Sequence, residues 1–188
     1  VQVGEGLDST EEHGVILAAS LANLGMRSGR SVGMITHGED LVWLAPNMSD
    51  EHNWSILRAL ALIEPGKMDL TGLLDLSRPG LSQNTSLIMI TPAVKGRWLE
   101  ALIAIRRQHI VPTVLLFDPQ TFGGEASPKG ISEDLSRLGI LNEVIPRDLL
   151  DREEIQPGRE GHWQWRVSPL GKAVADMEPE ELAWRGLG

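Results

Sequence analysis

The sequence contains no cysteine and no tyrosine, and it has only two phenylalanines in 188 residues. The absence of cysteine excludes a disulfide framework, a thiolate metal site and a cysteine nucleophile. No apolar run approaches the roughly 20 residues that a membrane-spanning helix needs. These absences remove several classes of protein without selecting one.

Basic residues are also scarce, since 17 Lys and Arg stand against 26 Asp and Glu and give a formal net charge of −9. A nucleic-acid partner requires a basic surface that neutralises phosphates, so this balance argues against one. The content of 41% hydrophobic and 23% charged residues is typical of a globular chain. A length of 188 residues suits one ordinary domain, and we expect a single domain over 1–188.

Hydrophobic periodicity and turn residues predict an alternation of helices and strands. Two continuous apolar runs, 85–91 and 111–117, are typical of strands buried on both faces. The alternation predicts an α/β fold: a doubly wound, mostly parallel sheet with helices on both faces and one antiparallel edge hairpin. The expected helices are about 10–28, 51–63, 70–77, 97–109 and 131–138, and the expected strands are about 31–37, 41–45, 85–91, 111–117, 141–146 and 162–167.

Local signals set several of these boundaries. Ser9 and Glu12 have the spacing of a capping box, Asp69 can cap the helix at 70–77, and Gly29 suits the end of the first helix. Pro46 is expected to end the second strand. The stretch 119–130 is interpreted as a flexible loop.

The six tryptophans are the main aromatic residues. Trp54 and Trp98 lie on apolar faces of predicted helices, so we expect both in the core. Trp163 and Trp165 alternate with polar residues on a strand. We expect them to pack against a core, and an aromatic binding stripe is the alternative.

Two clusters of polar residues have the composition of a site. The segment 37–40 (HGED) could form an acid–base or metal cluster, but it also stands where a hairpin needs turn residues, and the turn is favoured. Glu11, Glu12 and His13 are consecutive on a helix and diverge by about 100° per residue, so they cannot converge on one ion. No nucleophile elbow, P-loop or dinucleotide fingerprint occurs.

Four segments, in order, resemble bacterial proteins of domain-of-unknown-function family 58, whose characteristic region is similar to a von Willebrand factor A domain. They are STEEHGVILAASLANLGMRSGRSVGMITHGEDLVWLAP at 9–46, LRALALIEPG at 57–66, TSLIMITPAV at 85–94 and GHWQWRV-x-PLGKAV at 161–174. The resemblance implies a doubly wound sheet. It also implies that the chain lies in the cytoplasm, either as a separate protein or at the cytoplasmic face of a membrane protein, because family members often have membrane helices upstream. Members of the family are frequently encoded beside MoxR-type AAA+ ATPases.

A competent von Willebrand A domain binds Mg²⁺ through an Asp-x-Ser-x-Ser loop, a Thr and an Asp. The present sequence has no such loop, Met68 stands where the Thr would fall, and Pro92 follows the buried strand where the Asp would stand. Asp69 and Thr91 are the only remnants of such a site. We therefore expect no metal, no cofactor and no catalytic residue.

The family pattern begins one strand earlier, with a central strand ahead of the long apolar helix. The expectation is therefore a fragment of a longer chain that lacks its first strand, or an altered sheet. Three segments could take the place of the missing central strand: residues 1–3, the strand at 162–167 and a strand of a second copy. Residues 1–3 are shorter than a usual strand of about 5–6 residues. The hypothesis is that the chain associates with itself or depends on residues upstream of Val1.

Together these observations predict a non-catalytic interaction or scaffold module, with a protein partner such as an AAA+ ATPase. The alternative is a metal-dependent hydrolase or ligand-binding enzyme that uses Asp40, Asp69 or Asp118, because doubly wound folds bind ligands where strands end. A convergent cluster of carboxylates would favour the enzyme.

Overall fold

The computed structural model describes residues 2–64, 66–82, 85–151, 164–167 and 173–177. The chain divides into two compact units, Val1–Arg147 and Asp148–Gly188. The second unit contains an antiparallel pair of strands, β6 (Gln164–Val167) and β7 (Ala173–Met177). Trp163 and the side chain of Trp165 lie outside the described part of the chain, so their expected packing stays a prediction, as does a single domain over 1–188.

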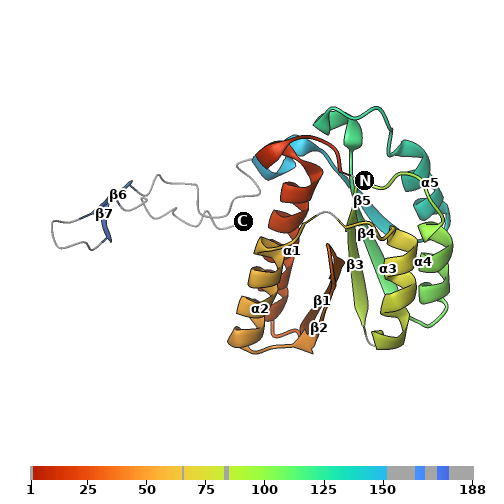
Figure 1. Cartoon of the computed structure of the whole chain (residues 1–188), viewed down its shortest axis with the longest axis horizontal. Helices are drawn as coiled ribbons and strands as arrows, with labels where there is room; N and C mark the ends of the chain where they lie inside the picture. The colour runs from red at the N-terminus through yellow and green to blue at the C-terminus, as the bar shows by residue number, and fades with distance from the viewer. Residues whose placement is uncertain (1, 65, 83–84, 152–163, 168–172, 178–188) are drawn as a thin grey trace, which may run out of the picture. The chain divides into compact units, whose positions relative to one another are not determined.

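The first unit is a mixed α/β structure with helices on both sides of its strands (Figure 1). Strands β3, β4 and β5 form a parallel sheet, and β1 and β2 form an antiparallel hairpin. The helices are α1 (Thr10–Arg27), α2 (Asp50–Ala61), α3 (Leu70–Ser77), α4 (Trp98–Arg106) and α5 (Lys129–Arg137), and the strands are β1 (Val32–His37), β2 (Leu41–Asn47), β3 (Ser86–Thr91), β4 (Val111–Phe117) and β5 (Leu141–Ile145). Short 3₁₀ turns are η1 (Gly6–Asp8), η2 (Arg78–Gly80) and η3 (Pro119–Phe122).

Helix ends follow the predicted caps. The Ser9 hydroxyl accepts a hydrogen bond from the Glu12 amide at 3.2 Å, and the Asp69 carboxylate accepts one from the Gly72 amide at 3.0 Å. Each satisfies an amide that the first helical turn leaves without a partner. Gly29 follows α1 with φ +71°, a conformation that glycine adopts without strain.

Most of the buried apolar residues in the described part of the chain fall into two clusters. The larger cluster joins α3, α4 and α5 to the parallel sheet, and Trp98, Leu102 and Val114 are among its fully buried members. The smaller cluster joins α1 and α2 to the hairpin around Ala22, Ile56 and Leu60. The expected core position of Trp98 is therefore confirmed.

The core position expected for Trp54 is wrong, because 72% of this residue is exposed. Helix α2 packs on α1 and the hairpin through Ile56 and Leu60, and this contact lies on another side of the helix. The apolar face in the sequence is therefore wider than the face that is buried.

Pro46 does not end β2, which continues to Asn47. Val32 pairs with Asn47 and Met34 with Leu44, so the single residue Gly33 stands opposite two residues of β2. Pro46 lies in this bulge, one of the few places where a strand tolerates proline. A Cβ on Gly33 would approach the Leu44 carbonyl oxygen to 2.8 Å, so the bulge also depends on glycine.

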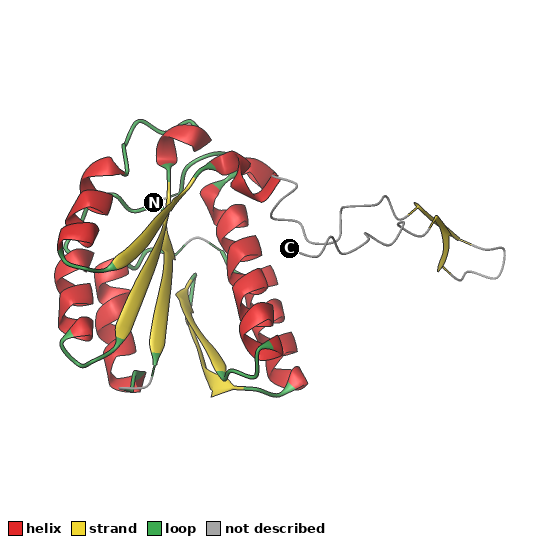
Figure 2. Cartoon of the chain, turned by 180° about the vertical axis from the view of Figure 1, so that it is seen from behind, coloured by secondary structure: helices red, strands yellow, loops and turns green. Residues whose placement is uncertain are grey.

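The expected hairpin is present, but it is not an edge of the parallel sheet. Within the described residues, β1 and β2 form one two-stranded sheet and β3, β4 and β5 form a separate three-stranded sheet. Seen from the front and from behind, the hairpin lies on the β3 side of the parallel sheet (Figure 2). The predicted α/β class holds, whereas the described strands do not join into a single continuous sheet.

The stretch predicted as a loop at 119–130 contains ordered structure. Residues Pro119–Phe122 form η3, and Phe122 is buried against Phe117 and His13 in edge-to-face contacts with centroid distances of 5.6 and 5.0 Å. These aromatic contacts fix the start of α1 over the end of β4. Among the residues described, no helix is long and apolar enough to cross a membrane.

Candidate functional site

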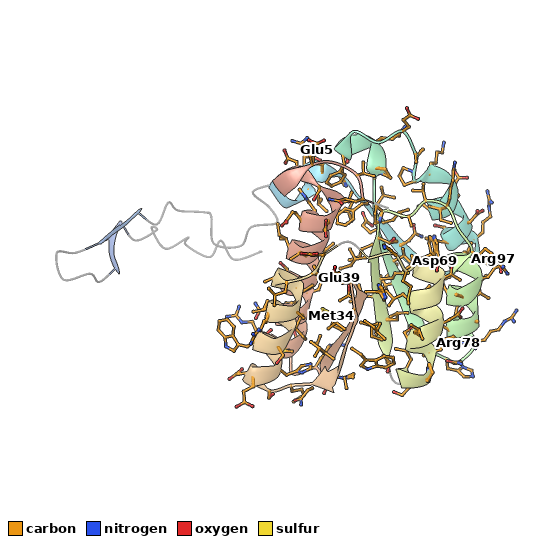
Figure 3. The ribbon with its side chains drawn as sticks, viewed as in Figure 1. Glu5, Met34, Glu39, Asp69, Arg78 and Arg97 are labelled. Atoms are coloured by element: carbon orange, nitrogen blue, oxygen red, sulfur yellow. The ribbon has the colours of Figure 1, made fainter. Side chains whose placement is uncertain are left out.

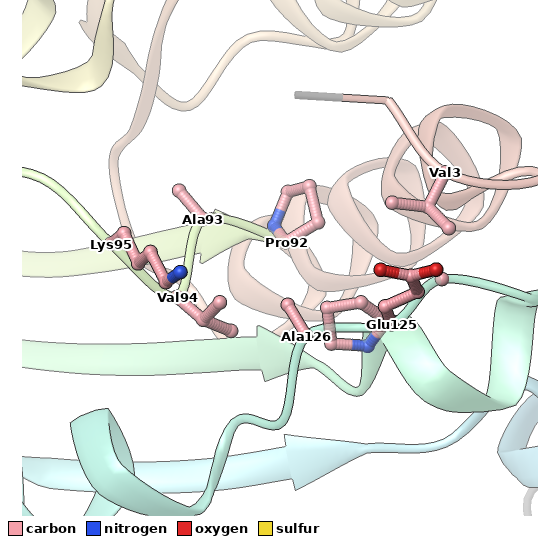
Figure 4. A pocket seen from close by; sticks show the side chains of 9 residues that line it. Val3, Pro92, Ala93, Val94, Lys95, Glu125 and Ala126 are labelled. Carbon is pink, nitrogen blue, oxygen red and sulfur yellow. The ribbon is translucent and has the colours of Figure 1, made fainter.

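The candidate site lies where β3 and β4 end. The segments that follow these strands and the N-terminal segment enclose a hollow of about 200 Å³ (Figure 4). Parallel α/β sheets commonly bind ligands at this edge. The lining residues are Val3, Pro92, Ala93, Val94, Lys95, Pro119, Gly124, Glu125 and Ala126.

Reciprocal hydrogen bonds hold the N-terminal segment beside the hollow. The Val3 amide donates to the Thr10 hydroxyl at 3.1 Å, and the Thr10 amide donates to the Val3 carbonyl at 2.8 Å. Thr10 is buried in the first turn of α1, so Val3 is anchored to a helix. The anchoring makes Val3 a fixed part of the wall.

Gly124 allows the segment after η3 to approach the Val3 side chain closely. A Cβ on Gly124 would lie 2.9 Å from the Val3 side chain and 3.0 Å from the Pro119 carbonyl oxygen. The Gly124 amide also donates to that carbonyl at 2.8 Å. A larger residue in place of Gly124 would push this segment away from Val3 and the N-terminal segment.

The chemistry of the hollow is mostly apolar. Its nine lining residues provide one ammonium group, on Lys95, and one carboxylate, on Glu125, and they include no hydroxyl and no imidazole. Lys95 and Glu125 are both exposed. The lining suits an apolar group with charges near its rim, and it offers no pair of acid and base groups.

Asp69 and Thr91, which the resemblance marks as remnants of an adhesion site, both bind the local backbone. Asp69 begins α3 (Figure 3) and caps it, as described above. Thr91, the last residue of β3, is 5% exposed, and its hydroxyl accepts a hydrogen bond from the Ala93 amide at 3.1 Å. Neither residue lines the hollow.

The acids of the alternative enzyme are not assembled into a metal centre. The Asp118 carboxylate accepts a hydrogen bond from the Gln120 amide at 3.1 Å and caps η3. Asp40 lies in the hairpin turn, where its carbonyl accepts from the Gly38 amide at 3.1 Å. No group of three or more His, Asp or Glu side chains in the described parts of the chain is placed to hold a metal ion.

The segment 37–40 forms the hairpin turn that was favoured over a site. The His37 Nδ1 atom is buried without a hydrogen-bond partner. A Cβ on Gly66 would lie 2.7 Å from this atom, so the segment after α2 covers the ring. The turn is therefore packed against a second segment of the chain.

One electrostatic feature was not predicted. Partial burial, followed by the negative charges of Glu12 and Glu64, raises the pKa of Glu11 above its ordinary value. Glu12 is a sequence neighbour, whereas Glu64 follows α2 and comes near only through the fold. No local pattern in the sequence relates Glu11 to Glu64.

Comparison with protein-family models, with curated proteins and with solved structures gave no match for this chain.

Proposed function

We propose that this chain is a von Willebrand A-like module of the bacterial cytoplasm that binds a protein partner and carries out no catalysis. The order of its elements supports this: a long helix, an antiparallel hairpin, and parallel strands with helices on both sides. This is the arrangement that the sequence resemblance implies. The structure by itself establishes only the α/β class.

The observation that carries the proposal is the lining of the hollow. Small and apolar side chains surround it, with Lys95 and Glu125 at the rim. Apolar centres with polar rims are typical of protein–protein contacts. A hydrolase would instead need acid groups that converge, and Asp69 and Asp118 are both used as caps.

The proposed partner is a MoxR-type AAA+ ATPase, because such enzymes are encoded beside members of the family that the sequence resembles. An apolar side chain of the ATPase would enter the hollow, and charged residues around it would meet Lys95 and Glu125. Fixed walls favour such docking, because little conformational entropy is lost when a side chain enters a preformed recess.

Binding of the 188-residue chain to a purified MoxR-type ATPase tests the proposal. Biolayer interferometry with and without ATP should show saturable binding that Lys95→Glu and Ala126→Arg weaken about tenfold or more. Arg107→Glu is the matched control, since it makes the same charge change on an exposed residue at the far end of α4. Absence of binding in both nucleotide states contradicts the partner, and equal weakening by Arg107→Glu contradicts the docking site.

The enzyme alternative has its own test. Hydrolysis of p-nitrophenyl phosphate with Mg²⁺ or Mn²⁺ should stay at the rate of the buffer. A metal-dependent rate that Asp69→Ala or Asp118→Ala abolishes would overturn the proposal of a non-catalytic module.

A further inference from the structure

The segment that joins β3 to α4 has a run of backbone donors without acceptors. The Ala93 amide donates to the Thr91 hydroxyl, and the Glu100 amide donates to the Arg97 carbonyl at 3.0 Å. Between these two, the amides of residues 94–99 donate to no acceptor in the described part of the chain. They follow the end of β3, where the hollow lies. An acceptor from outside the chain can therefore bind them.

The last of these amides belong to the first turn of α4. This helix has nine residues, and its N-cap residue Arg97 makes no side-chain hydrogen bond to the first turn. The aligned peptide dipoles of a helix give its start a partial positive charge, and the free amides point toward a bound acceptor. Both properties favour an anion.

A buried side-chain donor in the same place also lacks an acceptor. Trp98 is 1% exposed, and its Nε1 atom is buried with no hydrogen-bond partner in the described part of the chain. The edge of the indole that carries this atom faces the loop, because a Cβ on Gly96 would lie 3.3 Å from Trp98 Cδ1 and 4.0 Å from Nε1. Buried donors are nearly always paired, so this N–H marks a place where an acceptor is missing.

Gly96 leaves the approach to this N–H free of a side chain. The residue is exposed and has φ +126°, a conformation that favours glycine. Any other residue at position 96 would place its Cβ beside the indole nitrogen of Trp98. The glycine therefore lets the backbone of the loop and a ligand come close to the buried donor.

Two cationic side chains flank the free amides. Lys95 and Arg97 are exposed, and Arg97 stands at the start of α4 (Figure 3). Arg97 pairs with Glu100 at 3.2 Å, but the two side chains are 83% and 70% exposed, so a ligand can displace this weak pair. Glu125 lines the same hollow as Lys95, and within the described residues the two form no ion pair. In a chain of net charge −9, these cations are a local feature.

We propose that the segment 94–99 binds a phosphate group. Its free amides and the Trp98 indole N–H are the hydrogen-bond donors, and Lys95 and Arg97 balance the charge. A phosphate suits this segment better than a carboxylate, because it has more acceptor oxygens for a run of donors and carries more charge for two cations. A free phosphate ion and a phosphorylated serine side chain present the same chemistry. The site does not depend on the proposed ATPase partner.

NMR titration of the isotope-labelled 188-residue chain with inorganic phosphate and with O-phosphoserine, at constant ionic strength, tests the site. The amide signals of residues 94–99 and one of the six indole N–H signals should shift together and saturate. Tighter binding of inorganic phosphate identifies a free ion as the ligand, and tighter binding of O-phosphoserine identifies a phosphorylated side chain.

Three variants assign the donors and charges. Lys95→Gln should weaken binding about fivefold or more, because a charged hydrogen bond is lost. Trp98→Phe keeps an aromatic ring in the core, removes the N–H, and should weaken binding about threefold or more. Glu100→Gln should instead strengthen binding about twofold, because it releases Arg97. The first and third variants change exposed residues, so they test the site without disturbing the core.

Arg107→Gln is the matched control, since it removes the same charge from an exposed residue at the other end of α4. Three results would overturn the proposal. They are the absence of a saturable shift in residues 94–99 with both probes, equal weakening by Arg107→Gln and Lys95→Gln, and binding of acetate as tight as that of phosphate.

Discussion

The indole ring of Trp43 on β2 covers Gly80 in η2 so closely that a Cβ on Gly80 would overlap it. Trp43 is paired with Ile35 in the hairpin, whereas Gly80 ends the turn that precedes β3. The contact therefore links the hairpin to the parallel sheet. With no ladder between the two sheets in the described residues, side-chain packing of this kind sets the position of the hairpin.

Gly80→Ala should lower the free energy of unfolding by about 1–3 kcal/mol, because the added methyl group must displace the indole. The φ angle of Gly80 lies outside the left-handed region, so the backbone itself adds no strain. Urea unfolding of Gly80→Ala, Trp43→Ala and the double variant measures the coupling. The same cost of Gly80→Ala in both backgrounds would show that Trp43 is not its cause.

Trp98→Ala should destabilise the chain by about 3–5 kcal/mol, because a large side chain that is 1% exposed leaves a cavity in the larger cluster. Trp54→Ala is the matched control and should change stability by no more than about 0.5 kcal/mol, since Trp54 is on the surface. Chemical denaturation followed by circular dichroism compares the two. Equal losses would contradict the assignment of Trp98 to the core.

Asp69→Ala should lower stability by about 1 kcal/mol, the usual cost of removing an N-cap. Asp69→Asn keeps an oxygen for the Gly72 amide and should restore most of the loss. Thermal melts compare the two variants with the wild type.

Calorimetric titration of the same proteins with Mg²⁺ and Mn²⁺ separates a cap from a metal ligand. A saturable isotherm with micromolar affinity that is lost in Asp69→Ala would contradict the structural role of this carboxylate.

Glu11→Gln should help the folded chain more at pH 7 than at pH 4. The pKa of Glu11 is raised above the ordinary value of a glutamate, chiefly by partial burial and then by the charges of Glu12 and Glu64. A carboxyl group with a raised pKa binds its proton more readily in the folded state, so its contribution to stability is lost as the pH rises through the folded pKa.

The difference in melting temperature between Glu11→Gln and the wild type should therefore grow with pH. Removing the neighbouring charge with Glu64→Gln should reduce this growth. A difference that shrinks between pH 4 and pH 7 would contradict the raised pKa.

Features that depend on a few neighbouring residues were predictable from the sequence. The caps at Ser9 and Asp69 are of this kind, because the side chain and the backbone group that it satisfies are three residues apart. The strand at β3 was also expected, but it is not buried on both faces, since Ile88 is 49% exposed. The exposure of Trp54 and the bulge at Pro46 depend on which surface or strand lies opposite. Sequence periodicity does not contain that information.

The candidate site, too, could be predicted from the sequence only in part. Asp69 and Thr91 were named as remnants of an adhesion site, and in the structure both accept hydrogen bonds from nearby backbone amides. The hollow itself was not predicted, since Val3, Lys95 and Gly124 come from three separate segments. Apolar and small residues in loops carry no recognisable chemical pattern, so a recess at this place could not be predicted.

The two separate apolar clusters have a consequence for local unfolding. Regions of a protein that share few packed side chains can open independently of one another. Among the described residues, the cluster of α1, α2 and the hairpin has three buried apolar members, whereas the cluster on the parallel sheet has eleven. The part built from α1, α2 and the hairpin should therefore be a distinct unit of partial unfolding, which opens while α4 and β4 remain folded.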